Sequence, residues 1–196
     1  MPEVKELEML VNAIPFKMPA PVEIPAHLVS MLRQLSPDQA VHRAMELLLQ
    51  IEAAEVLIYE QVDVEGRLRL GGVVCQDAAQ AGPIQELLAG EELYGQPLSS
   101  AGLAGRALAQ GSALLVMGQA RAGEQGSLPP QLQKLLIQRG TGGDIGFVYV
   151  LPLGGAGRRP LGALTLVRGA AAGPLNHEQP GLAEGMRQVL AGILAG

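Results

Sequence analysis

The sequence predicts an α+β domain of two or three layers, in which long amphipathic helices cover one face of an antiparallel sheet. Two pairs of apolar, strand-like runs are joined by short turns, which is typical of β-hairpins. Apolar residues recur at helical spacing within residues 36–54 and again after residue 177. The chain has 196 residues and is 48% hydrophobic, so it can bury a sizeable core.

Residues 1–35 differ in composition from the rest of the chain, and we interpret them as a proline-rich apolar arm that precedes a domain at 36–196. Short helices are predicted in VKELEMLVNAI and at 27–35, and an extended or irregular path is predicted between them. That path is expected from its prolines, which lack an N–H and restrict the preceding residue: Pro15, Pro19, Pro21 and Pro25. The apolar residues of the arm predict that it packs on the domain or on a second copy of the chain.

The domain is predicted to begin with a helix over 36–54. Ser36 can cap this helix, Pro37 suits its first position, and Gln39 completes a capping box. Strands are predicted at 55–64 and 67–75. The Glu65-Gly66 turn between them makes this segment a hairpin.

The remaining elements are predicted from the same signals. We expect short helices at 83–89 and 101–111, a strand at 113–117 and a helix over 131–140. Strands are predicted at 147–153 and 161–167. A closing helix should begin near residue 177 or a residue or two later, with Asn176 and Gln179 at its cap.

The turn GGAGRR at 154–159 resembles a phosphate-binding loop only in its glycines. A Walker loop continues into Lys-Ser or Lys-Thr and a helix, so that backbone amides meet the phosphates. Here Pro160 and a strand-like run come next instead. The segment is therefore predicted to be a hairpin tip, with Arg158 and Arg159 either solvated or meeting an acidic partner.

The composition argues against several functions. The formal charge is −5 with scattered basic residues, which is unlike a nucleic-acid-binding protein. No apolar run reaches the length of a membrane span. Arginine, glycine and alanine are abundant, which favours a bacterial source.

Catalytic signals are also weak. His27, His42 and His177 lack metal-ligand spacing, and no G-x-S-x-G turn occurs. The single cysteine, Cys75, excludes an internal disulfide and favours a cytoplasmic setting. It is expected to be a buried thiol, the alternative being a redox or attachment role. We expect no enzyme activity, no metal and no cofactor.

Four segments, in order over residues 36–196, resemble GAF domains. The motif G-L-x-G-R-x-x-x-x-G is matched by Gly102, Leu103, Gly105, Arg106 and Gly111. A second family pattern is a strand that ends in Pro-Leu, followed by a turn and then G-x-L-x-L. Pro152 and Leu153 match its first part, and Gly162, Leu164 and Leu166 match its last. The hairpin EVLIYEQVDVEGRLRLGGVV and the closing segment PLNHEQPGLAEGMRQVLAGI complete the resemblance. The cyclic-nucleotide signature, the bilin-attaching cysteine and the several cysteines of free methionine sulfoxide reductases are absent from the sequence.

The resemblance implies a central antiparallel sheet of five or six strands, with terminal helices on one face that often dimerise. Short helices and loops on the other face can enclose a small-molecule pocket. Strand alternation suggests polar pocket residues, and free amides at a helix start can meet an anion. The ligand-binding candidates are Tyr59, Cys75, Gly102, Leu103, Tyr149 and Thr165. The alternative for each is an ordinary packing role.

Three functions remain open. The first is a stand-alone sensory or regulatory domain that binds a small molecule, a protein partner or both, and signals through a homodimer made by the terminal helices. The second is a ligand-free interaction module with a collapsed pocket. The third is a redox enzyme of the free methionine sulfoxide reductase type.

Overall fold

The computed structural model describes residues 13–90, 94–100, 102–117, 145–154, 157–169, 176 and 178–196. The helix expected at 131–140 and residues 4–12 of the helix expected in VKELEMLVNAI lie outside these residues. The last two residues of that second helix, Ala13 and Ile14, were predicted wrongly, because they belong to a strand that pairs at the sheet edge. The other expected elements are all present, and their bounds agree with the sequence prediction to within a few residues.

The described strands form one six-stranded antiparallel sheet in the order β1-β4-β5-β6-β2-β3. This confirms the predicted antiparallel α+β architecture. The strands are β1 (Ala13–Phe16), β2 (Val56–Val62), β3 (Leu68–Cys75), β4 (Ala113–Met117), β5 (Ile145–Leu153) and β6 (Gly162–Gly169). Both expected hairpins, β2–β3 and β5–β6, are adjacent pairs in the sheet.

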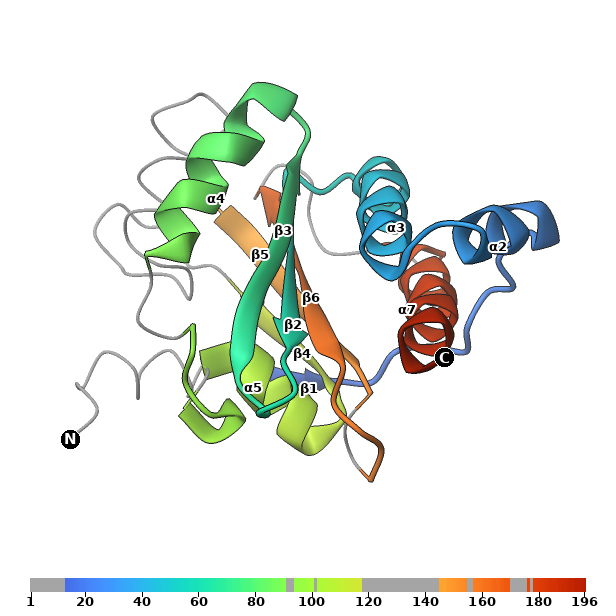
Figure 1. The fold of residues 1–196 in the computed structure, drawn as a ribbon. Helices are drawn as coiled ribbons and strands as arrows, with labels where there is room; N and C mark the ends of the chain where they lie inside the picture. The colour runs from blue at the N-terminus through green and yellow to red at the C-terminus, as the bar shows by residue number, and fades with distance from the viewer. Residues whose placement is uncertain are drawn as a thin grey trace.

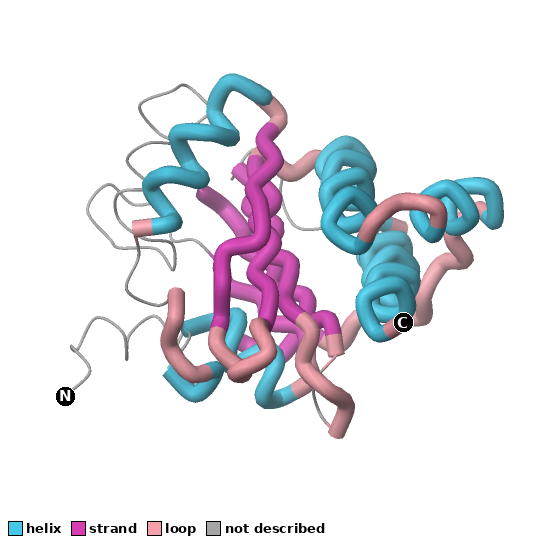
Figure 2. The backbone as a smooth tube through the Cα atoms, viewed as in Figure 1, coloured by secondary structure: helices cyan, strands magenta, loops and turns pink. Residues whose placement is uncertain are grey.

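Helices cover both faces of the sheet (Figures 1 and 2). On one face lie α2 (Ala26–Arg33), α3 (Pro37–Ile51) and α7 (Gln179–Ala195), so the terminal helices share a face as expected. On the other face lie the short helices α4 (Ala81–Ala89) and α5 (Gly102–Gln110).

Each face has its own apolar core, and strand alternation decides which residues enter it. On β2, Val56 and Ile58 point to the α4/α5 side, whereas Leu57 and Tyr59 point to the α3/α7 side. The α4/α5 core adds Ile84, Leu88, Ala104, Ala107 and Leu108 from the helices. The α3/α7 core adds Val41, Met45, Leu48, Ala183, Met186 and Leu190.

Side chains near the start of each long helix, α3 and α7, bond to the backbone N–H groups there. The Ser36 hydroxyl accepts from the Gln39 N–H, and the Gln39 side chain accepts from the Ser36 N–H, which confirms the predicted capping box. At α7, the Asn176 Oδ1 accepts from the Glu178 and Gln179 N–H groups. Helix α7 begins at Gln179, and its N-cap residue, Glu178, makes no side-chain capping hydrogen bond.

We expect Ser36→Ala to lower the free energy of unfolding by about 1 kcal/mol, because an N–H at the start of α3 loses its acceptor. Ser30→Ala is the matched control, because Ser30 lies exposed within α2 and does not cap it. Urea titration of both variants measures the difference. Equal stability of the two variants would show that the box does not stabilise α3.

Residues 13–25 lie along the domain of their own chain. β1 pairs with β4 at the sheet edge, and the chain then runs from this edge to the face of the sheet that carries α7 (Figure 1). There the Val22 N–H donates to the Gly181 carbonyl at 2.8 Å. A Cβ on Gly181 would lie 2.8 Å from the Val22 side chain, and one on Gly185 would overlap the Val22 carbonyl oxygen. The two glycines, one helical turn apart, let the arm backbone lie directly on α7.

The glycine-rich segment after β5 is the connection of a hairpin, as predicted. Gly154 and Gly157 have φ values of 81° and 88°, which favour glycine. The Leu161 N–H donates to the Leu153 carbonyl where the two strands meet. Arg158 and Arg159 are exposed.

Candidate functional site

A polar cluster lies within the apolar core beneath α4 and α5. Its centre is the Glu60 carboxylate on β2, which is only 8% exposed. The Tyr94 hydroxyl donates to Glu60 Oε1 at 3.1 Å, and the Thr165 hydroxyl donates to Oε2 at 3.4 Å. Thr165 lies on β6, the strand next to β2.

The β2–β3 pairing is irregular beside Glu60, where Gly71 of β3 has no partner on β2. The register shifts between Tyr59 and Glu60, so Tyr59 pairs with Gly72 and Glu60 with Leu70. β2 itself keeps a regular register with β6 through Tyr59 and Glu60. The ordinary alternation of β2 therefore places the Glu60 carboxylate on the same side as Ile58, among the aliphatic side chains of the α4/α5 core.

Tyr94 is held beside the sheet by the backbone of its own segment. The Gly95 N–H donates to the Leu68 carbonyl at 2.8 Å, and the Leu68 N–H donates to the Gln96 carbonyl at 3.2 Å. Gly95 has a φ of 86°, a conformation that favours glycine. This turn brings the half-buried Tyr94 to Glu60.

Burial raises the pKa of Glu60 to about 7, and the hydrogen bonds from Tyr94 and Thr165 partly oppose that rise. Among the described residues, no charged side chain contributes to the shift. A titratable group with a pKa near neutrality on a covered sheet face is a candidate binding or catalytic group.

The structure divides the six residues expected to bind a ligand between the two faces. Thr165 bonds to Glu60, and Cys75 and Leu103 belong to the α4/α5 core. Gly102 begins α5 and is exposed, with a φ of 59°. Tyr59 and Tyr149 belong to the α3/α7 core instead. The six residues therefore do not line a single cavity.

Tyr59 has a clear packing role. A Cβ on Gly162 would lie 2.9 Å from the Tyr59 ring, and one on Gly71 would overlap that ring. The ring therefore lies against glycines on both neighbouring strands. Burial and nearby Asp38 raise the pKa of Tyr59 to about 12. Tyr149 packs edge-on against Phe16 and stacks with Phe147.

Sequence reasoning missed Glu60 and Tyr94. The available signal was a single acid inside the apolar run VLIYEQV, at a position that alternates with Tyr59. The alternation of a strand divides its side chains between the two faces of the sheet, but it does not identify which helices cover each face. Tyr94 carried no signal, because its contact with Glu60 depends on the turn at Gly95.

A second buried carboxylate, Glu52, lies at the C-terminal cap of α3. It is fully buried, and neither of its carboxylate oxygens has a hydrogen-bond partner among the described residues. Burial raises its pKa to about 8, and the charge of Arg168 partly opposes the rise. Arg168, itself 2% exposed, donates to the Glu52 backbone carbonyl. Gln179 of α7 donates to the Ile51 carbonyl, so α3, β6 and α7 meet here.

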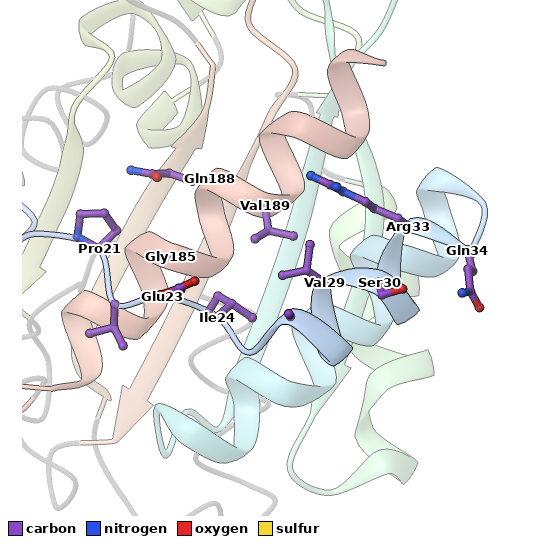
Figure 3. Close-up of a pocket in the computed structure, with 12 residues that line it drawn as sticks. Pro21, Glu23, Ile24, Val29, Ser30, Arg33, Gln34, Gly185, Gln188 and Val189 are labelled. Carbon is purple, nitrogen blue, oxygen red and sulfur yellow. The ribbon is translucent and has the colours of Figure 1, made fainter.

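Two surface grooves lie on or beside the α3/α7 layer. One, of about 680 Å³, is bounded by the arm, α2 and α7, and Figure 3 shows Val29 and Val189 facing each other across it. The other, of about 770 Å³, lies between α3 and the end of β3, with His42, Arg43 and Cys75 among its lining residues. Burial raises the pKa of the Cys75 thiol to about 11, with a contribution from Asp77. A thiol in that state is a poor nucleophile.

Within the described ranges, no group of three His, Cys, Asp or Glu side chains is arranged to hold a metal ion. None of the helices in that part of the chain is long and apolar enough to cross a bilayer.

Solved structures with a similar fold are GAF domains. The GAF domain of a phosphoenolpyruvate-protein phosphotransferase from Acinetobacter matches with a TM-score of 0.59 and 12% identity, covering 100% of this chain and 95% of that one. The GAF domain region of a Geobacter sulfurreducens protein matches with a TM-score of 0.57 and 19% identity, covering 84% and 97%. A GAF domain/HD domain protein from the same organism gives 0.54 and 14%, covering 82% and 93%. No family model and no curated protein matches the sequence. The chain therefore has a GAF-like fold, as its sequence motifs indicated.

Proposed function

We propose that this protein is a cytoplasmic sensory or regulatory domain that binds a small molecule on the α4/α5 face of its sheet. The observation that carries the proposal is the buried Glu60 carboxylate with its two hydroxyl partners. A buried polar cluster in an otherwise aliphatic layer offers orientation and specificity to a ligand. Thr165 contacts that ligand together with Glu60, and Leu103 and Cys75 supply apolar surface.

The output of such a domain passes through a second copy or a protein partner. The side of the molecule formed by α2 and α7 presents half-buried apolar residues that suit an interface: Val29, Leu182, Val189, Ile193 and Leu194. We propose a homodimer through this side. Light scattering at micromolar concentrations tests it, and a monomer at every concentration would contradict it.

Ligand binding is tested by methyl NMR with pooled nucleotides, amino acids, amines and organic acids. The two cores serve as internal references for each other. A ligand of the proposed site is expected to shift methyls of Ile58, Ile84 and Leu108 while leaving Leu57 and Leu190 unchanged. If no pool shifts the α4/α5 methyls, the small-molecule proposal is wrong.

A ligand-free interaction module is the second candidate. Ile84, Leu88 and Leu108 pack directly on the sheet and are almost fully buried, which favours it. If the α4/α5 methyl signals of the protein do not shift with any pool, the result favours the interaction module.

A redox enzyme of the free methionine sulfoxide reductase type is disfavoured, because the only cysteine is buried and its pKa is raised.

A further inference from the structure

We propose that the ligand of this site carries a protonated nitrogen, as an ammonium, amidinium or guanidinium group, that binds the Glu60 carboxylate. This inference rests on the proposed function and names the ligand chemistry of the same site. It predicts that carboxylates and phosphates do not bind the ionised form of Glu60.

The first argument is hydrogen-bonding capacity. A carboxylate offers about four acceptor sites, and each Glu60 oxygen accepts one hydrogen bond from a neutral hydroxyl. Both oxygens therefore retain acceptor capacity. Because an ionised carboxylate only accepts hydrogen bonds, a ligand that binds it must offer a donor.

The second argument is the missing counter-charge. Thr165 comes from β6, Leu70 lies opposite on β3, and Tyr94 comes from the segment after α4. The helices of this face carry Glu86 on α4, which is exposed, and Arg106 on α5, which is half-buried. Within the described part of the chain, Glu60 forms no ion pair. Buried charges in proteins are generally paired, so a ligand cation would supply the positive charge that the ionised form of Glu60 lacks among the described residues.

The third argument is the position of Tyr94. Its hydroxyl occupies Oε1 at 3.1 Å, a longer contact than the 2.7–2.9 Å typical of a charged donor on a carboxylate. Tyr94 is half-buried, whereas the Glu60 carboxylate to which it donates is only 8% exposed. A cationic N–H that displaces this hydroxyl makes the stronger bond.

Proton linkage supplies a signature of this binding mode. A cation favours the ionised form of Glu60, whose pKa is about 7. Affinity is then expected to rise about tenfold from pH 6 to pH 8, since the ionised fraction rises by that factor. At pH 7 each bound cation releases about half a proton.

The experiment compares cations with neutral molecules of the same shape on the full chain. Butylguanidinium is matched with butylurea, and butylammonium with butanol. Methyl NMR measures binding at pH 6 and pH 8, and calorimetry in two buffers of different ionisation enthalpy measures proton release. At least one cation is expected to shift the α4/α5 methyls, with the tenfold pH effect, while its neutral partner binds at least tenfold more weakly.

Variants assign the effect to the carboxylate. Glu60→Gln, which keeps the shape and the fold of the protonated form, should reduce cation affinity at pH 8 at least tenfold. Tyr94→Phe removes the competing hydroxyl and should strengthen cation binding about two- to tenfold. Glu46→Gln, a half-exposed acid of α3, is the control and should bind like wild type.

Three outcomes overturn the inference: equal binding by a neutral partner, unchanged affinity in Glu60→Gln, and absence of the pH effect. If other metabolites still shift the α4/α5 methyls, the proposed function survives while the ligand class is wrong. If no molecule shifts them, both are wrong.

Discussion

Glu52→Gln is expected to make the protein more stable at pH 8 than the wild type, by about 1–3 kcal/mol. In the folded protein the pKa of Glu52 is raised to about 8 from an ordinary value of 4.5. The folded state therefore binds this proton more tightly than the unfolded state does. The contribution of this protonated carboxyl to the free energy of unfolding is fully present below about pH 4.5 and is lost as the pH rises through about 8. Glutamine mimics the protonated form and keeps that stability at high pH.

The measurement is a series of urea titrations from pH 5 to pH 9. The stabilities of wild type and Glu52→Gln should differ least at pH 5, should diverge progressively up to about pH 8, and should run parallel above that pH, because the unfolded carboxyl ionises near pH 4.5 and the folded one near pH 8. Glu46→Gln should follow the wild type throughout, because Glu46 lies partly exposed beside Arg43. A Glu52→Gln curve parallel to the wild type at every pH would mean that Glu52 is ionised without cost.

Gly185→Ala is expected to destabilise the protein by about 1–3 kcal/mol, although alanine is the better helix former. The added Cβ would overlap the Val22 carbonyl and lie 3.3 Å from the Ile24 side chain. Either the arm must leave α7 or the helix must shift. Loss of the arm exposes Ile24, which is buried, and breaks the hydrogen bond between Val22 and Gly181.

Gly192→Ala is the matched control in the same helix. No atom lies within 4 Å of a Cβ built there, so this change should stabilise the protein by about 0.5–1 kcal/mol. Urea titration measures both variants, and limited trypsin digestion at exposed Lys17 reports on the arm. Cleavage should be faster in Gly185→Ala only. If both alanines stabilise the chain, the arm does not lie closely on α7.

Several features were predictable from short stretches of sequence. Ser36, Pro37 and Gln39 specified the start of α3, and the observed capping box has the predicted partners. Gly66 and Gly154 marked the hairpin connections, because each has a positive φ that favours glycine. The motifs around Gly102 and Pro152 indicated the GAF-like fold. These signals are local, since each depends on residues within a few positions of one another.

The candidate site depended on the tertiary structure. Thr165 could be nominated from its strand, but Tyr59 and Tyr149 could not be assigned to a face from alternation alone. The pairing of β2 with β6 and the turn at Gly95 decided which polar groups meet.

The sequence by itself therefore determined the fold class, the main caps and turns, and most of the elements, whereas strand β1 was evident only from its pairing with β4. The tertiary structure decided where the charges are buried. Tyr94 and Thr165 lie 34 and 105 residues from Glu60 along the chain, and Arg168 lies 116 residues from Glu52. Such contacts form only when strands and helices from distant segments pack together. The burial and the hydrogen bonds that shift the pKa values of Glu52 and Glu60 therefore exist only in the folded protein.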